Sequence, residues 1–213
     1  ARTDAHERRT LDPAQLADQL ADVLWWKGDV KACSAALEGG LDDLGDADPD
    51  LYVRLYTEKV IVQNLHGPAL DRLRELAEWG LPSSRLALLA LAPFVALRGE
   101  GCHEVVDLVE RGLDGGLLLA DEDFDAETEV VRALLALVIV DELERAQKLV
   151  QVKLADAQKC GSVAGFITFA IVDGWIALRR GDLAQAEADA RAGYKLAAEH
   201  DLVHLGLFSV TNL

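Results

Sequence analysis

Residues 173–199, DGWIALRRGDLAQAEADARAGYKLAAE, contain the signals for two helices and for the turn that joins them. At the centre of this stretch, Gly181 and Asp182 end one run of apolar periodicity and begin the next. Glycine adopts the left-handed conformation that closes a helix, and aspartate accepts free amide protons from the first turn of the following helix. We therefore predict two antiparallel helices, a unit that needs neighbours of the same kind to bury its apolar face.

The second helix of this pair carries small residues on one face, at Ala186, Ala190 and Gly193. Their spacing of three and four residues places them together, where they allow another helix to approach closely. Near the start of the chain, a second glycine-aspartate turn is followed by the same pattern, and Ala21 stands where the later pair has Gly174. The matching positions in that earlier helix are Cys33, Leu37 and Gly40.

Turn signals recur along the whole chain and divide it into units spaced 36, 36, 41 and 40 residues apart. The tetratricopeptide repeat has a period of about 34 residues, so these longer intervals indicate longer helices and variable loops. We expect eleven helices and no strand, arranged as a superhelical array of antiparallel pairs similar to a tetratricopeptide solenoid. This all-α repeat domain would span residues 11–213, after an N-terminal leader at residues 1–10. The predicted turn positions are Gly28, Asn64, Glu100, Asp141 and Gly181.

Local signals place several helix ends. Asp12 is expected to cap the first helix, with Pro13 in its first turn. The segment 46–50, DADPD, contains a proline and a final aspartate that predict another helix from about Leu51. Pro93 lies inside a predicted helix and should bend it, because proline removes one helical hydrogen bond. Residues 115–125 are predicted to form the longest loop.

Composition restricts the classes of partner and compartment. The formal net charge of -16 would repel a phosphate backbone, so we expect this segment not to bind nucleic acid. The three cysteines are far apart in sequence and odd in number, which favours free thiols in a reducing compartment. A polar N-terminus and short apolar runs predict a cytoplasmic protein with no membrane association. The absence of methionine favours a piece of a longer chain, or a sequence in which modified methionines are not written.

Motifs for catalysis and metal binding are incomplete. No glycine is followed by the Lys-Ser or Lys-Thr of a phosphate-binding loop. Asp121, Asp123 and Asp125 have the opening spacing of a calcium loop, but Arg132 stands where that loop needs its glutamate. His200 and His204 share a helical face without a third ligand. We therefore predict no catalytic, cofactor-binding or metal-binding residue in this chain.

Aromatic residues suggest a binding groove. If the first helix of each pair lines one side of the array, three large aromatic side chains from three pairs face that side, with aliphatic residues between them. Packing in the core is the alternative explanation for these side chains. The predicted groove residues are Trp25, Phe94, Val131, Leu135, Val138 and Trp175.

Three segments resemble one protein family in sequence. They are 20–37 (LADVLWWKGDVKACSAAL), 159–166 (KCGSVAGF) and 174–202 (GWIALRRGDLAQAEADARAGYKLAAEHDL). The chain is similar to the helical-repeat region of the large ATP-dependent LuxR-type transcriptional regulators of bacteria. The resemblance covers residues 11–213 and implies a sensor or scaffold that receives an inducer or a partner protein and biases self-assembly. It also implies that ATP binds an upstream domain and that DNA binds a C-terminal domain, neither of which this segment contains.

Two other classes of function remain open. A free-standing repeat adaptor would use the same groove to bind a peptide or a protein. An enzyme built on a helical array would need titratable groups that converge in a pocket. The full reading frame on both sides of the segment would distinguish a regulator segment from an adaptor.

Overall fold

A computed structural model describes residues 12–99, 101–114, 127–202 and 205. Within these residues the chain forms ten α-helices and no strand, so the described part of the chain is all-helical, as predicted. The helices are α1 (Pro13–Trp26), α2 (Val30–Leu44), α3 (Pro49–Val62), α4 (Pro68–Ala77), α5 (Ser84–Leu97), α6 (Cys102–Gly112), α7 (Glu127–Ile139), α8 (Leu143–Cys160), α9 (Val163–Arg180) and α10 (Leu183–Glu199).

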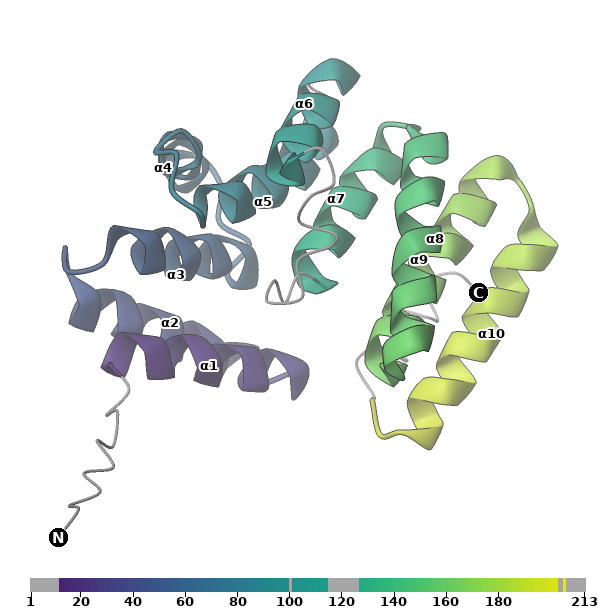
Figure 1. Cartoon of the computed structure of the whole chain (residues 1–213), viewed down its shortest axis with the longest axis horizontal. Coiled ribbons are helices and arrows are strands. Elements are labelled where there is room, and N and C mark those ends of the chain that lie inside the picture. The colour runs from purple at the N-terminus through teal and green to yellow at the C-terminus, as the bar shows by residue number, and fades with distance from the viewer. Residues whose placement is uncertain (1–11, 100, 115–126, 203–204, 206–213) are drawn as a thin grey trace, which may run out of the picture.

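The helices form a curved array that is two layers thick (Figure 1). The odd-numbered helices α1, α3, α5, α7 and α9 each pack against the next odd-numbered helix, which gives one continuous layer. Each even-numbered helix packs against the odd-numbered helix before it, and α2, α4, α6 and α8 also pack against the one after it. The odd-numbered layer therefore joins α1 at one end to α9 at the other.

A left-handed residue follows every odd-numbered helix and reverses the chain. In four of these turns, the next residue donates its backbone N–H to the carbonyl five residues earlier at 2.9 or 3.0 Å, which is the Schellman arrangement. Asp29 and Asp182 then accept a backbone N–H from the first turn of the next helix, at 3.0 and 3.1 Å. The left-handed residues are Gly28, Asn64, Gly99, Asp141 and Gly181.

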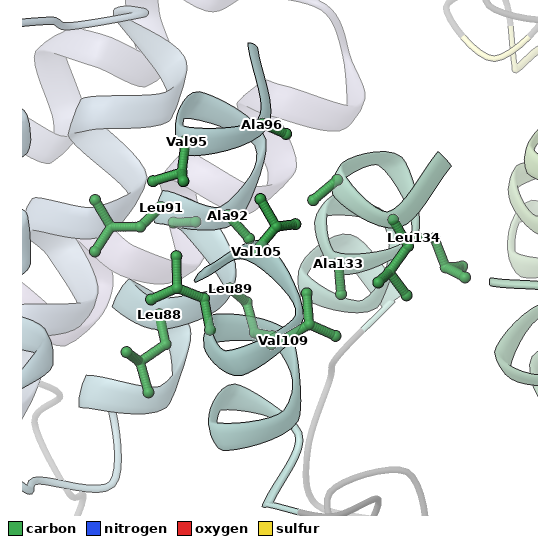
Figure 2. Packing of buried hydrophobic residues seen from close by; sticks show 14 of the residues in the cluster. Leu88, Leu89, Leu91, Ala92, Val95, Ala96, Val105, Val109, Ala133 and Leu134 are labelled. Carbon is green, nitrogen blue, oxygen red and sulfur yellow. The ribbon is translucent and has the colours of Figure 1, made fainter. Parts of the chain in front are cut away.

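The main core surrounds α5, which is apolar on nearly every side and packs against α3, α4, α6 and α7. A helix that is apolar all round needs neighbours on all sides, and its position in the middle of the array provides them. Figure 2 shows α5 side chains, including Leu88 and Leu89, beside Val105 and Val109 of α6 and close to Ala133 and Leu134 of α7. Pro93 lies inside α5 without ending it.

Some predicted boundaries need correction. The helix expected from about Leu51 begins at Pro49, because Asp48 rather than Asp50 accepts the free N–H groups of its first turn. The turn expected at Glu100 has its left-handed residue at Gly99, and Glu100 lies outside the described residues. The loop expected over 115–125 and most of the eleventh helix expected over 200–213 also lie outside them. Of the ten described helices, none has the length and apolar character needed to cross a membrane.

The small residues predicted to permit close helix packing are buried as expected. Ala186 and Ala190 are 1% and 0% exposed, and Gly193 is buried beside them on α10. The matched positions on α2 are also buried, and a Cβ atom built on Gly40 would lie 2.7 Å from the Cβ of Ala17. Such a distance leaves no room for a side chain, which explains why this position carries glycine.

Replacing Ala186 with leucine should overpack the contact between α9 and α10. We expect a loss of roughly 1–3 kcal/mol in the free energy of unfolding, because a packed interface accommodates extra methyl groups only by moving its neighbours. A urea titration measures this loss, and the exposed Ala188, replaced in the same way, is the matched control. An unchanged urea midpoint for Ala186→Leu would show that this face of α10 is open.

Candidate functional site

An open cleft lies on the odd-numbered layer, between α1, the N-terminal half of α3 and the start of α5. Its volume is about 320 Å³, and all of its walls come from odd-numbered helices or from residues that cap them. The even-numbered helices contribute nothing to it. We call this site the α1–α3 cleft, and its lining residues are Gln15, Asp18, Gln19, Asp48, Asp50, Leu51, Arg54 and Ser83.

Two sets of polar contacts fix the walls of the α1–α3 cleft. The Arg54 guanidinium donates from Nε to Asp18 at 3.0 Å, and its Nη2 lies 4.0 Å from Asp22, so α3 is tied to α1. Asp50 accepts from the backbone N–H and from the hydroxyl of Ser83, at 2.8 and 3.0 Å, which ties α3 to the start of α5. Burial raises the pKa of Asp18, against the opposing attraction of Arg54.

A buried ionic group lies further along the same layer, where α3 and α7 come together. Arg132 of α7 donates from Nη1 and Nη2 to the two carboxylate oxygens of Glu58 on α3, both at 3.1 Å. Its Nη1 also donates to Glu129, one turn earlier on α7, at 3.3 Å. Arg132 and Glu129 are only 8% and 7% exposed. We call these three residues the Arg132 cluster.

The two carboxyl groups of the Arg132 cluster have different affinities for protons. Burial raises the pKa of Glu129 to about 7, since the attraction of Arg132 is too weak to offset it and the neighbouring Glu58 adds repulsion. Burial acts on Glu58 in the same direction, but its two bonds to Arg132 and the hydrogen bond from Glu129 lower its pKa below the ordinary value. Glu58 is therefore the charged partner of Arg132, and Glu129 carries the proton.

The charged residues of the cleft and those of the cluster interact electrostatically. Arg54 interacts with Glu129 as well as with its partners on α1, and Glu58 acts on Asp18. Charged side chains thus run across the odd-numbered layer from α1 through α3 to α7. No group of three histidine, cysteine or acidic side chains in the described part of the chain has the geometry to hold a metal ion.

Comparison with known proteins adds no assignment. No protein family, no curated protein and no solved structure matches this chain.

The six residues predicted for the groove all lie on odd-numbered helices, and all of them except Val138 are half-buried. Trp25 packs against the core formed by α1, α2 and α3, whereas Phe94, Val131 and Trp175 pack against the main core. The ring of Phe94 meets His66 edge-on, with 5.7 Å between centroids. Leu135 lies on α7 one turn after Arg132. The structure thus places these residues on one layer, but Trp25 packs against a different core from Phe94, Val131 and Trp175, and Val138 is buried in the main core.

The sequence analysis did not identify the Arg132 cluster as a site. A signal for it is present in the segment 129–140, EVVRALLALVIV, where Glu129 and Arg132 are the only residues that are not apolar. A charge in such a setting needs a buried partner. Glu129 on the same helix is one partner that spacing could have indicated, whereas Glu58 lies 74 residues away and required the fold.

Proposed function

We propose that this chain is a helical-repeat binding scaffold, organised as a tetratricopeptide-like solenoid, that holds a protein segment or a small-molecule inducer on its odd-numbered layer. Following the family resemblance, it would be the sensor or scaffold segment of a cytoplasmic LuxR-type transcriptional regulator. ATP and DNA would then be bound by other domains, and ligand binding here would bias self-assembly. The repeated turns and the two-layer packing support the architecture in this proposal.

The observation that carries the proposal is the position of the α1–α3 cleft. It opens on the layer formed by the first helix of each pair, and it is lined by polar side chains from three successive odd-numbered helices. Such a site suits an extended segment that contacts several repeats at once. Asp48, Gln15 and Gln19 are exposed there and are free to exchange water for a ligand.

The charge of the cleft favours a cationic ligand. Three aspartates and one arginine line it, and the whole chain carries a formal net charge of -16. A field of one sign speeds the approach of an oppositely charged partner and disfavours a like-charged one. We therefore propose a lysine- or arginine-containing segment as the preferred occupant, and no catalytic role for this segment.

Binding of short labelled peptides, followed by fluorescence anisotropy at low salt, tests the proposal. Three peptides would share an aromatic and apolar framework and would carry lysine and arginine, glutamate, or serine at the remaining positions. We expect the cationic peptide to bind at least about tenfold more tightly than the acidic one. Asp48→Asn should weaken that binding several-fold, since asparagine still caps α3 but removes one charge from the cleft.

Asp43→Asn is the matched control, because it removes the same charge from an exposed position on α2, away from the cleft. Equal effects of the two substitutions would show attraction to the overall charge rather than binding in the cleft. Trp175→Ala tests the predicted aromatic groove separately. We expect this substitution to weaken peptide binding more than replacement of the exposed Cys160 does. Specific binding of duplex DNA or ATP that persists at moderate salt would contradict the proposal.

An adaptor that acts as a separate protein is the second candidate, and it would use the same cleft and the same ligand chemistry. The peptide experiment does not separate it from a regulator segment. Sequencing the gene on both sides of this segment does, because a regulator places a nucleotide-binding module before it and a helix-turn-helix domain after it.

A further inference from the structure

The Arg132 cluster connects two parts of the odd-numbered layer that are not packed neighbours. Helix α3 packs against α5, and α5 packs against α7, whereas the backbones of α3 and α7 have little or no contact with each other. The bidentate bond from Arg132 to Glu58 spans this distance with side chains alone. Arg54 in turn ties α3 to Asp18 of α1. The link therefore joins α1 and α3 to α7.

The link contains more carboxyl groups than cationic groups. Two carboxyl groups share one guanidinium in a buried setting, and Glu58 and Glu129 accept from the same nitrogen of Arg132. If both carboxyls are ionised, one negative charge is left without a partner where it has little contact with water, which is costly. Glu58 holds two bonds from Arg132 and Glu129 holds one, so Glu129 is the group that takes up a proton.

Among the residues that the structure describes, no second cation is in direct contact with Glu129. From α3 it faces Glu58 and, at longer range, Arg54, which is already bonded to α1. From α1, Asp22 acts on Arg132 and adds negative charge. The other helices packed against α7 carry charged side chains with partners of their own, among them Arg85 with Asp114, Glu110 with Arg145, Glu144 with Arg180, and Asp141 with Arg179.

We propose that the Arg132 cluster is a proton-operated clasp, which holds α3 against α7 when Glu129 is protonated and loosens when Glu129 loses its proton. In the closed state, Glu58 and Arg132 balance one another and the neutral Glu129 donates to Glu58. In the loosened state, the extra buried charge repels Glu58 and draws water into the cluster. Because Arg54 connects α3 to α1, the same change reaches the wall of the α1–α3 cleft.

The direction of the pH dependence follows from the two carboxyl groups. The pKa of Glu129 is raised from 4.5 to about 7, so its stabilising effect is complete below 4.5 and is lost as the pH rises through 7. The pKa of Glu58 is lowered, so its contribution is present above its ordinary value and is lost only at more acidic pH. The clasp is therefore tightest at mildly acidic pH and weaker above neutrality.

Hydrogen-deuterium exchange of the whole chain, corrected for the intrinsic effect of pH on exchange, tests the clasp. Between about pH 5.5 and about pH 8.5, we expect amides in the second half of α3 and the first turns of α7 to lose protection by about tenfold or more in the wild type. Glu129→Gln mimics the protonated carboxyl and should keep these amides protected at both values. The exposed Glu187→Gln on α10 is the control and should behave like the wild type.

Unchanged corrected protection in the wild type, or the same loss of protection in Glu129→Gln, would overturn the proposal. If Glu129→Gln does not fold, carboxyl-carbon NMR of the wild type with isotope-labelled glutamate gives the answer without a variant. One glutamate that titrates near neutral pH supports the clasp. Titration of every glutamate below about pH 5.5 would contradict it.

Discussion

Replacing Arg132 with methionine is expected to lower the free energy of unfolding by about 3–5 kcal/mol at neutral pH. The reason is that Glu58 would lose both of its hydrogen bonds from the guanidinium, at 3.1 Å each, while its side chain stays largely shielded from water, at 20% exposure. An unpaired carboxylate in such a place lowers the free energy of unfolding by more than the intact ion pair raises it. Urea unfolding followed by circular dichroism measures the change.

A matched control separates this effect from the loss of any arginine. Arg191 on α10 also forms an ion pair, with Glu187 one turn away, but both side chains are more than half exposed. Arg191→Met should therefore change the stability by no more than about 0.5 kcal/mol. Equal losses for Arg132→Met and Arg191→Met would mean that the Arg132 cluster is open to water.

Phe169→Ala is expected to cost about 3–5 kcal/mol, the range for an aromatic side chain removed from a closed core. Phe169 is 1% exposed and joins α9 to the main core around α5 and α7. Its loss would leave a cavity where the second half of the array meets the first. Calorimetry or urea unfolding measures this loss. Tyr194→Ala, at a position that is 51% exposed, should be nearly neutral, and equal effects of the two would contradict the packing.

The turns were predictable from sequence because their causes lie within a few residues. Gly181 closes α9 in the left-handed conformation and Asp182 caps α10, and both effects depend only on adjacent backbone groups. The buried small residues Ala186 and Ala190 were also predicted, because a repeated spacing of small side chains indicates a close helix contact. Structural features are easiest to predict from sequence where the local signals agree with the packing of the whole fold.

The start of α3 shows where local reasoning fails. Asp48 and Asp50 flank one proline, and either could cap the helix on sequence alone. In the folded chain Asp50 is bonded to Ser83, which lies 33 residues away, and Asp48 is left to cap α3. A tertiary partner decided between two locally equivalent residues.

The candidate site was predictable only in part for the same reason. Periodicity placed Trp25 and Phe94 on the correct layer of helices, but it could not show that each packs against a different core. The Arg132 cluster depends on a contact across 74 residues of sequence. No spacing within α3 or within α7 contains that information.

A double-mutant cycle between Arg132 and Glu58 tests most directly the claim that side chains join the two halves of the odd-numbered layer. It requires the urea unfolding free energies of the wild type, Arg132→Met, Glu58→Gln and the double variant at neutral pH. We predict a coupling energy of about 2 kcal/mol or more, because Glu58→Gln removes the charge that Arg132→Met leaves unpaired. Additive effects, with a coupling below about 0.5 kcal/mol, would show that α3 and α7 are not linked in this way and would contradict the account.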